Sequence, residues 1–218
     1  MPSEEPKPRR RQARGERRIA SLLQAAANVF CTSGYTAAST NAIAREASVS
    51  PGTLYQYFPN KEAIAVELSE RLLHQMRETH GQAFTPANLA LPLDRMLDAV
   101  LDPFIAFNVE NPAFLALMHG SEPIPGQIAE EHDALHASLL TRVESLLGHY
   151  LPDTPTAERH QVAEMTFALF KAGLDLVMTH EGAERDAYVT ELKRALFRYL
   201  DPLIGDAARP AESGIHTP

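Results

Sequence analysis

The chain has 218 residues, of which 44% are hydrophobic, so it can bury a substantial core as one large or two small domains. Its formal net charge of −8 is unevenly spread: residues 1–61 hold 9 Lys and Arg against 4 Asp and Glu (+5), whereas the remainder holds 11 against 24 (−13). A basic head on an acidic body confines phosphate binding to one end and excludes indiscriminate adhesion of the whole chain to nucleic acid.

The cysteine count and the hydropathy pattern indicate the compartment. Cys31 is the only cysteine, so the chain cannot form an intramolecular disulfide. It follows Phe30 near the end of an apolar helical pattern, and we expect a buried structural thiol without a function. No apolar run is long enough to span a membrane or to act as a signal peptide. The sequence therefore predicts a cytoplasmic protein without a membrane partner.

Residues 1–15 are rich in Pro, Arg and Glu and show no apolar periodicity, which predicts a disordered basic arm. Arg17 and Arg18 extend this basic stretch. Basic extensions can contact phosphates or lie in the minor groove beside a major-groove reader; the alternative is a solubilising tail. From Arg17 onward, apolar residues recur at helical spacing and end at Gly34, which predicts a helix that supports the next segment.

The stretch 39–61 predicts two short helices separated by a tight turn. Ser39 suits the N-cap of the first helix, and Ser50 with Pro51 suits the start of the second. Apolar residues one turn apart give each helix an inward face. Helices this short are stable only when they share a core. A helix-turn-helix does so while its second helix keeps an outer face free for the major groove of DNA.

A set of spaced motif elements runs through this region: Gly34-Tyr35, Ile43-Ala44, Val49-Ser50, Gly52-Thr53-Leu54-Tyr55, Tyr57-Phe58 and Lys61-Glu62. Together, over roughly residues 16–65, they resemble the tetracycline-repressor (TetR) family. The resemblance implies an all-α fold, with a helix-turn-helix DNA-binding domain over 16–62 and a helical ligand-binding and dimerisation domain over 63–205. The family commonly has Gly where this chain has Ser48, so a positive φ at that position would strain the backbone.

Two kinds of DNA contact are expected from this head, because phosphate contacts fix register and base-edge contacts give specificity. Tyr55 and Lys61 are expected at phosphates, with Thr40 near the backbone. The base edges are expected to face Asn41, Pro51, Gly52, Thr53 and Gln56. The complete set of expected DNA-binding residues is Arg17, Arg18, Thr40, Asn41, Ser50, Pro51, Gly52, Thr53, Tyr55, Gln56, Tyr57 and Lys61.

The chain from residue 60 onward has helical spacing throughout. Asn60 suits the N-cap of a long helix whose apolar stripe continues to Met76. Beyond residue 88 there is no strand alternation, and prolines divide the apolar pattern. This predicts helices over about 89–109, 112–119, 126–150, 156–180 and 185–204, followed by a flexible tail over 206–218.

The predicted helix 156–180 carries two apolar stripes, which need two packing partners. One partner is the core of the same chain. The resemblance implies that the other is a second subunit, joined by the last helix in a four-helix interface; the alternative is a helix buried all round in one chain. The residues expected at the interface are Val162, Leu169, Gly173, Leu176, Leu192, Leu196 and Tyr199.

The body is rich in adaptable apolar residues with a few polar groups among them. Most could simply fill a core. The family layout nevertheless implies an effector pocket for a hydrophobic or aromatic small molecule. Its expected lining is Met96, Phe104, Phe107, Asn108, Phe114, Met118, His119, Phe167, Phe170 and Lys171.

No G-x-S-x-G, G-x-x-x-x-G-K or H-E-x-x-H motif is present, so neither an enzyme nor a cofactor is expected. His132 and His136 lie one turn apart and would hold a metal only if His119 or another ligand joined them. The expected function is a ligand-responsive repressor, a homodimer on a palindromic operator released by a hydrophobic effector. The alternatives are a metal-responsive regulator of the same fold and an enzyme with a vestigial DNA-binding head.

Overall fold

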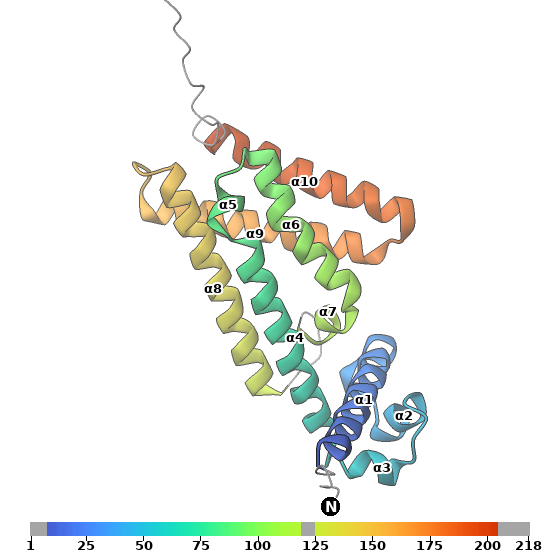
Figure 1. Ribbon diagram of the computed structural model, residues 1–218. Coiled ribbons are helices and arrows are strands. Elements are labelled where there is room, and N and C mark those ends of the chain that lie inside the picture. The colour runs from blue at the N-terminus through green and yellow to red at the C-terminus, as the bar shows by residue number, and fades with distance from the viewer. Residues whose placement is uncertain (1–7, 119–124, 205–218) are drawn as a thin grey trace, which may run out of the picture. The chain divides into compact units, whose positions relative to one another are not determined.

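The computed structural model describes residues 8–118 and 125–204. These residues form ten α-helices and no strand (Figure 1), which confirms the predicted all-α fold. The chain divides into two compact units. The head unit comprises residues 1–73 and 111–132, and the body unit comprises residues 74–110 and 133–218.

The head unit begins with α1 (Pro8–Ala37), α2 (Thr40–Glu46) and α3 (Pro51–Tyr55). It also contains the first part of α4 (Lys61–Ala83), all of α7 (Pro112–Met118) and the start of α8 (Gly126–Tyr150). The body unit holds the rest of α4 and α8 together with α5 (Pro86–Leu89), α6 (Leu93–Glu110), α9 (Thr156–Thr179) and α10 (Gly182–Ile204).

Helix α1 begins at Pro8, so residues 8–15 are helical where a disordered arm was expected. Proline is tolerated in the first turn, and Arg and Gln are good helix formers, so the basic run extends the helix that follows it. Residues 1–7 of the expected arm and the tail over 206–218 lie outside the described residues. Gly34 has φ 74° and ψ 163°, which confirms the predicted end of the regular helix there.

Cys31 is exposed on α1, so the expectation of a buried thiol is wrong. The helix instead buries a stripe that includes Leu22, Ala26 and Phe30, and Cys31 falls beside that stripe. Its sequence neighbour Phe30 is 1% exposed. Consecutive residues of an α-helix point about 100° apart around the axis, so one can be buried while the next is exposed.

The caps predicted for the two short helices are both confirmed. The hydroxyl Oγ of Ser39 accepts a hydrogen bond from the backbone N–H of Ala42 at 3.2 Å, and that of Ser50 accepts one from Thr53 at 3.1 Å. Ile43 and Leu54 are completely buried. The two helices therefore share the core that α1 provides, and their ends are held by side chains rather than by length.

The turn between α2 and α3 contains Ser48, whose φ is 53°. Among the described residues it is the single non-glycine residue with a positive φ. An L-residue in this conformation carries a steric penalty that glycine avoids, so Ser48 stores strain in the turn that links the two helices.

Ser48→Gly should raise the free energy of unfolding of the head by about 0.5–1 kcal/mol, because relief of the clash exceeds the extra chain entropy of glycine. Thermal unfolding followed by circular dichroism measures this. Ser48→Ala is the matched control, since alanine keeps the Cβ atom and should bring no gain. A lower unfolding temperature for the glycine variant would contradict the interpretation.

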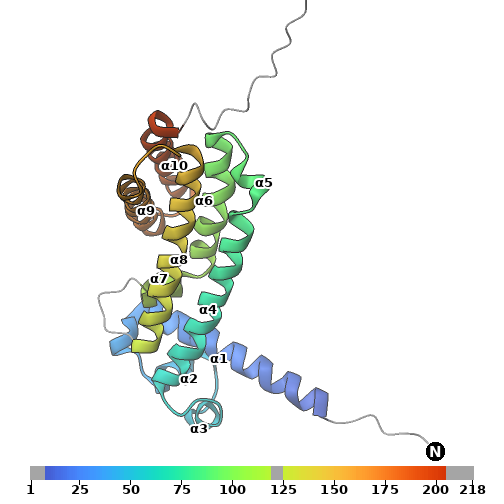
Figure 2. The same cartoon turned by 90° about the vertical axis from the view of Figure 1, so that its left-hand side faces the viewer.

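In the body unit, α9 and α10 run antiparallel and lie side by side (Figures 1 and 2). A Cβ atom on Gly173 of α9 would lie 2.4 Å from Cδ1 of Leu192 on α10, so a larger residue here would force the Leu192 side chain to move. Lys193 ties α10 to α6, because its ammonium bonds Asp98 at 2.8 Å and Asp102 at 2.5 Å. Three helices are thereby held together by one close contact and one ionic link.

The five helices predicted beyond residue 88 are present in the expected order, with one short helix in addition. A helix was expected over about 89–109, whereas the additional α5 ends at Leu89 and α6 begins after Pro92. Proline lacks an N–H and disfavours helical geometry in the residue before it, so the chain turns here. Pro103 lies inside α6, where the helix continues. No helix in residues 8–118 or 125–204 is long and apolar enough to cross a membrane.

Candidate DNA-reading face and effector cavity

Apart from Arg17 and Arg18, the expected DNA-binding residues lie on or next to α3 and at the starts of α2 and α4. Tyr55 and Tyr57 are 52% and 37% exposed, large fractions for aromatic side chains of a folded unit. Asn41, Ser50, Pro51, Gly52 and Gln56 are exposed as well, whereas Thr40, Thr53 and Lys61 are half-buried. Residues 47–61 contain no Asp or Glu, so no carboxylate on this segment would repel a phosphate.

Local hydrogen bonds fix the hydroxyl groups of this face. The Thr40 hydroxyl lies 3.0 Å from the Tyr55 hydroxyl, joining α2 to α3. The Ser50 and Thr53 hydroxyls lie 2.9 Å apart within the cap of α3. These groups hold the second helix at a fixed angle to the first, which is a requirement for reading a groove.

Lys61 is half-buried at the start of α4 and has partners within the chain. Its ammonium donates to the carbonyl oxygens of Tyr35 at 2.7 Å and Thr36 at 3.1 Å, and lies 4.5 Å from the centre of the Tyr35 ring. Burial and the nearby Glu62 carboxylate raise the pKa of the Tyr35 phenol. Lys61 therefore caps the end of α1 by charge and cation–π contact, a role that its spacing alone did not suggest.

Arg17 and Arg18 lie on α1. Arg17 is exposed, and its Nε donates to the backbone carbonyl of Ala13 at 3.1 Å, whereas Arg18 is half-buried. Because the chain is helical from Pro8, the arginines of this region lie on a rigid helix. Residues 8–15 therefore do not form the extended arm that a minor-groove contact would need.

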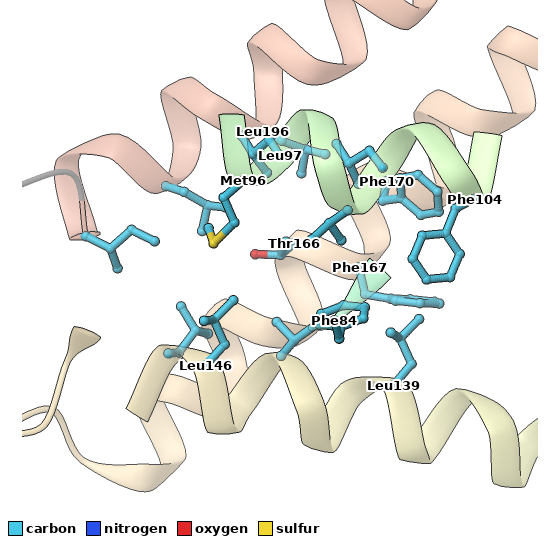
Figure 3. A pocket seen from close by; sticks show the side chains of 16 residues that line it. Phe84, Met96, Leu97, Phe104, Leu139, Leu146, Thr166, Phe167, Phe170 and Leu196 are labelled. Atoms are coloured by element: carbon cyan, nitrogen blue, oxygen red, sulfur yellow. The ribbon is translucent and has the colours of Figure 1, made fainter. Parts of the chain in front are cut away.

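The body unit contains an apolar cavity of about 90 Å³ that is partly open to solvent. Its walls come from α6, α8, α9 and α10, with Phe84 after the end of α4 (Figure 3). Thr166 is the one polar residue in the lining, and its hydroxyl donates to the carbonyl of Val162 at 2.7 Å. The walls thus offer hydrocarbon and aromatic surface and no charged group.

Aromatic rings crowd one part of this cavity. Phe104 lies 6.2 Å from both Phe84 and Phe170 in edge-on geometry, and Figure 3 shows Phe167 beside them. Met96 lines a different part of the wall (Figure 3). Walls of this kind can contact a flat ring or an alkyl chain.

The expected pocket residues divide into those that line the cavity and those that do not. Met96, Phe104, Phe167 and Phe170 line it. Phe107 and Asn108 are buried in α6 outside the lining, and Lys171 is exposed on α9. Phe114 and Met118 belong to α7 of the head unit, so their assignment to this pocket is wrong; His119 lies outside the described residues.

Sequence reasoning missed most of the aliphatic lining. The missed residues are Phe84, Leu97, Val100, Leu101, Leu139, Val143, Leu146, Leu147, Thr166, Leu196, Leu200 and Ile204. Helical spacing was the available signal, since positions 97, 100, 101 and 104 share one face of α6 and positions 139, 143, 146 and 147 share one face of α8. That spacing identifies an inward face without showing that the face borders a void.

Two buried polar groups lie beside the cavity-lining Phe104. Asn108 donates from Nδ2 to the Phe104 carbonyl at 2.8 Å, and its Oδ1 is a buried acceptor without a partner among the described residues. His80 is 5% exposed and its ring centre lies 4.8 Å from that of Phe104. Burial, and then the positive charge of Arg142, lower the pKa of His80 to about 4, so this imidazole is neutral at pH 7.

The expected dimer residues also divide. Leu192 and Leu196 are 5% and 0% exposed within one chain, and the half-buried Gly173 faces Leu192, so these three residues take part in the packing of α9 on α10 inside the chain. The close packing of α9 on α10 buries this side of both helices. Val162, Leu169 and Tyr199 are half-buried, and Leu176 is 48% exposed.

The second stripe of α9 remains uncovered. Met165 is 49% exposed, and with Leu169 and Leu176 it follows an i, i+4, i+11 pattern along one side of the helix. Leu203 of α10 is 41% exposed. Met165, Leu176 and Leu203 are the large exposed aliphatic side chains of the described body unit. We refer to Met165 and Leu176, with the half-buried Leu169 between them, as the outer stripe of α9.

Leu176→Asp, which puts a charge on the outer stripe, should yield a folded monomer with about half the mass of the wild-type particle, because an unpaired charge buried in an interface costs several kcal/mol. Light scattering measures the mass. Lys171→Asp, on another exposed side of α9, is the control and should stay dimeric. A dimer that survives Leu176→Asp would remove the outer stripe from the interface.

The histidine pair considered as a metal site has aromatic neighbours. The ring of His132 lies 6.4 Å from that of Phe114, and the ring of His136 lies 4.3 Å from that of Phe167. Within residues 8–118 and 125–204, no three His, Cys, Asp or Glu side chains gather as a metal site would require. The alternative of a metal-responsive regulator is not supported.

An exposed, acid-free second helix of a helix-turn-helix, together with a helical unit around an apolar cavity, defines a DNA-binding regulator with a ligand-binding unit. Comparisons with known proteins agree. Residues 22–68 match the description "Bacterial regulatory proteins, tetR family", and residues 91–204 match "Tetracyclin repressor-like, C-terminal domain". The chain belongs to the TetR family of DNA-binding transcriptional regulators.

Individual relatives are more distant. YhgD of Bacillus subtilis (strain 168), an uncharacterized HTH-type transcriptional regulator, is 26% identical over 125 residues, 57% of this chain and 64% of that protein. The HTH-type transcriptional regulator UidR of Escherichia coli (strain K12) is 41% identical over 61 residues, 26% of this chain and 31% of that protein. The matched segments thus span less than two thirds of either relative.

Among solved structures, a TetR-like transcriptional regulator from Rhodococcus sp. RHA1 superposes with a TM-score of 0.65 at 21% identity. The match covers 84% of this chain and 95% of that one. At this level of identity the likeness concerns the fold, and it agrees with the all-α architecture of both units.

Proposed function

We propose that the protein is a transcriptional repressor that binds a palindromic operator as a homodimer and leaves it when a small hydrophobic molecule fills the body cavity. The observation that carries the effector half of this proposal is the apolar cavity of the body unit, whose walls carry no charged side chain. Apolar and aromatic walls around a space that the protein's own side chains leave unfilled favour a small hydrophobic ligand.

The DNA half of the proposal assigns roles by exposure. Exposed Gln56, Gly52 and Asn41 are assigned to base edges, and exposed Tyr55 to phosphate. Lys61 keeps an assignment to phosphate, although its ammonium also holds the end of α1. Two heads related by a two-fold axis would contact half-sites about one helical turn, or roughly 34–36 Å, apart or somewhat more, so the operator should be an inverted repeat.

Coupling between effector and operator follows from linkage. A ligand that prefers the conformation with poorer operator geometry lowers DNA affinity, and DNA lowers ligand affinity by the same factor. We place the division between DNA-binding and effector-binding domains near residue 62, at the start of α4. This helix contains residues of both compact units and is the proposed route of coupling. On this proposal the protein is a regulator without catalytic activity of its own.

Gln56→Ala should change base preference at one or two operator positions by about 1–3 kcal/mol each, because a side chain that reads a base edge discriminates among bases. A binding selection on randomised duplexes measures the preference. Lys61→Ala is the comparison, since loss of a phosphate contact should weaken all sequences alike and flatten the salt slope by about one unit. Equal loss on operator and scrambled DNA would contradict the role of Gln56.

The effector proposal is tested with compounds found by thermal shift and then scored for release of operator DNA. Phe167→Trp should weaken binding of the hits by about tenfold, because the larger ring occupies the cavity. Phe107→Trp is the matched control: Phe107 is buried in α6 but lies outside the lining, so the hits should still bind. Hits that raise the unfolding temperature without releasing operator, or that bind both variants alike, would refute the proposed site.

A further inference from the structure

A second hollow lies beside the apolar cavity in the body unit. It is bordered by α5 and the C-terminal half of α8. Leu146, which Figure 3 shows in the wall of the cavity, lines this hollow as well. The Tyr150 hydroxyl donates to the Leu89 carbonyl at 2.6 Å and so ties α8 to α5 on one side of the hollow. The two spaces therefore border one another at Leu146.

The lining of this second hollow differs in chemistry from that of the cavity. It includes Arg142, Ser145 and His149, spaced along α8 at three- and four-residue intervals, so that they lie on one side of the helix. Neither hollow is lined by an Asp or Glu. No charged side chain lines the apolar cavity, whereas the guanidinium of Arg142, which is always charged, lines the second hollow.

Arg142 is exposed and forms no ion pair within residues 8–118 and 125–204. This is unusual in its setting, because residues 62–218 carry 24 acidic against 11 basic side chains. Arg142 lies one turn before Leu146 on α8, and Leu146 lines both the cavity and the hollow, so Arg142 is carried beside the wall that the two spaces share. After burial, its charge is the second cause of the lowered pKa of His80, whose ring lies 4.8 Å from that of the cavity-lining Phe104.

The geometry points to an amphipathic anion as the ligand class: a molecule whose apolar tail fills the cavity and whose acidic headgroup binds Arg142 in the adjoining hollow, with Ser145 and His149 as further donors. This inference rests on the proposed effector role of the cavity and adds the headgroup site. A guanidinium forms paired hydrogen bonds with a carboxylate or a phosphate, so both headgroups share the required chemistry.

The test uses three probes with one alkyl chain: dodecanoate, dodecyl phosphate and dodecanol. Calorimetric titration of the full-length protein should show that at least one anionic probe binds about tenfold more tightly than dodecanol, which corresponds to about 1.4 kcal/mol. The relative affinities of dodecanoate and dodecyl phosphate identify the headgroup. Arg142→Gln should abolish the preference and leave the affinity for dodecanol unchanged, while Arg142→Lys should keep part of it.

Arg194→Gln is the matched control, because Arg194 is an exposed arginine on α10 outside both hollows. It should keep the full preference for the anions. Equal affinity of all three probes for the wild type, or a preference that survives Arg142→Gln, or one that both glutamine variants lose alike, would overturn the headgroup site. Dodecanol binding that persists in those cases would leave the proposed effector cavity standing, whereas binding of no probe would count against the alkyl ligand class itself.

Discussion

The close approach of α9 to α10 at Gly173 is the contact on which the body unit depends. A Cβ atom at this position would lie 2.4 Å from Cδ1 of Leu192, so at the present spacing of the two helices a side chain there would force Leu192 to move. The packing of α9 on α10 buries Leu192 and Leu196 and leaves Met165 and Leu176 of α9 exposed. It thus separates apolar residues of the core from apolar residues that remain on the surface.

The same packing accounts for the cavity. Once α9 is held against α10, and α10 is held against α6 through Lys193 and its two aspartates, the inner faces of α6, α8, α9 and α10 surround a space that their own side chains do not fill. Large rings at Phe104, Phe167 and Phe170 stand at one part of the wall, where edge-on contacts hold them. The void is supported by a rigid frame, and a preformed site lowers the entropic cost of binding a ligand.

In the head unit, precision comes from short-range hydrogen bonds. The cap of Ser50, the link between Thr40 and Tyr55, and the Lys61 contacts to the end of α1 fix helices that are too short to be stable alone. The strained φ of 53° at Ser48 is accepted because the turn must place α3 at its angle to α2. The outer face of α3, which carries no Asp or Glu, therefore remains exposed for DNA binding.

The sequence by itself determined the all-α fold, the caps at Ser39 and Ser50, the turn between the two short helices and the separation of a basic head from an acidic body. These features depend on local spacing, backbone stereochemistry and charge counts, which are properties of neighbouring residues. Only the tertiary structure decided that Leu192 and Leu196 are core, that α7 with Phe114 belongs to the head unit, that Leu139 and Val143 line a cavity, and that Arg142 stands beside it. Helical periodicity shows that a face is buried, but which element covers it depends on contacts between residues far apart in the chain, and a void is the absence of such contacts.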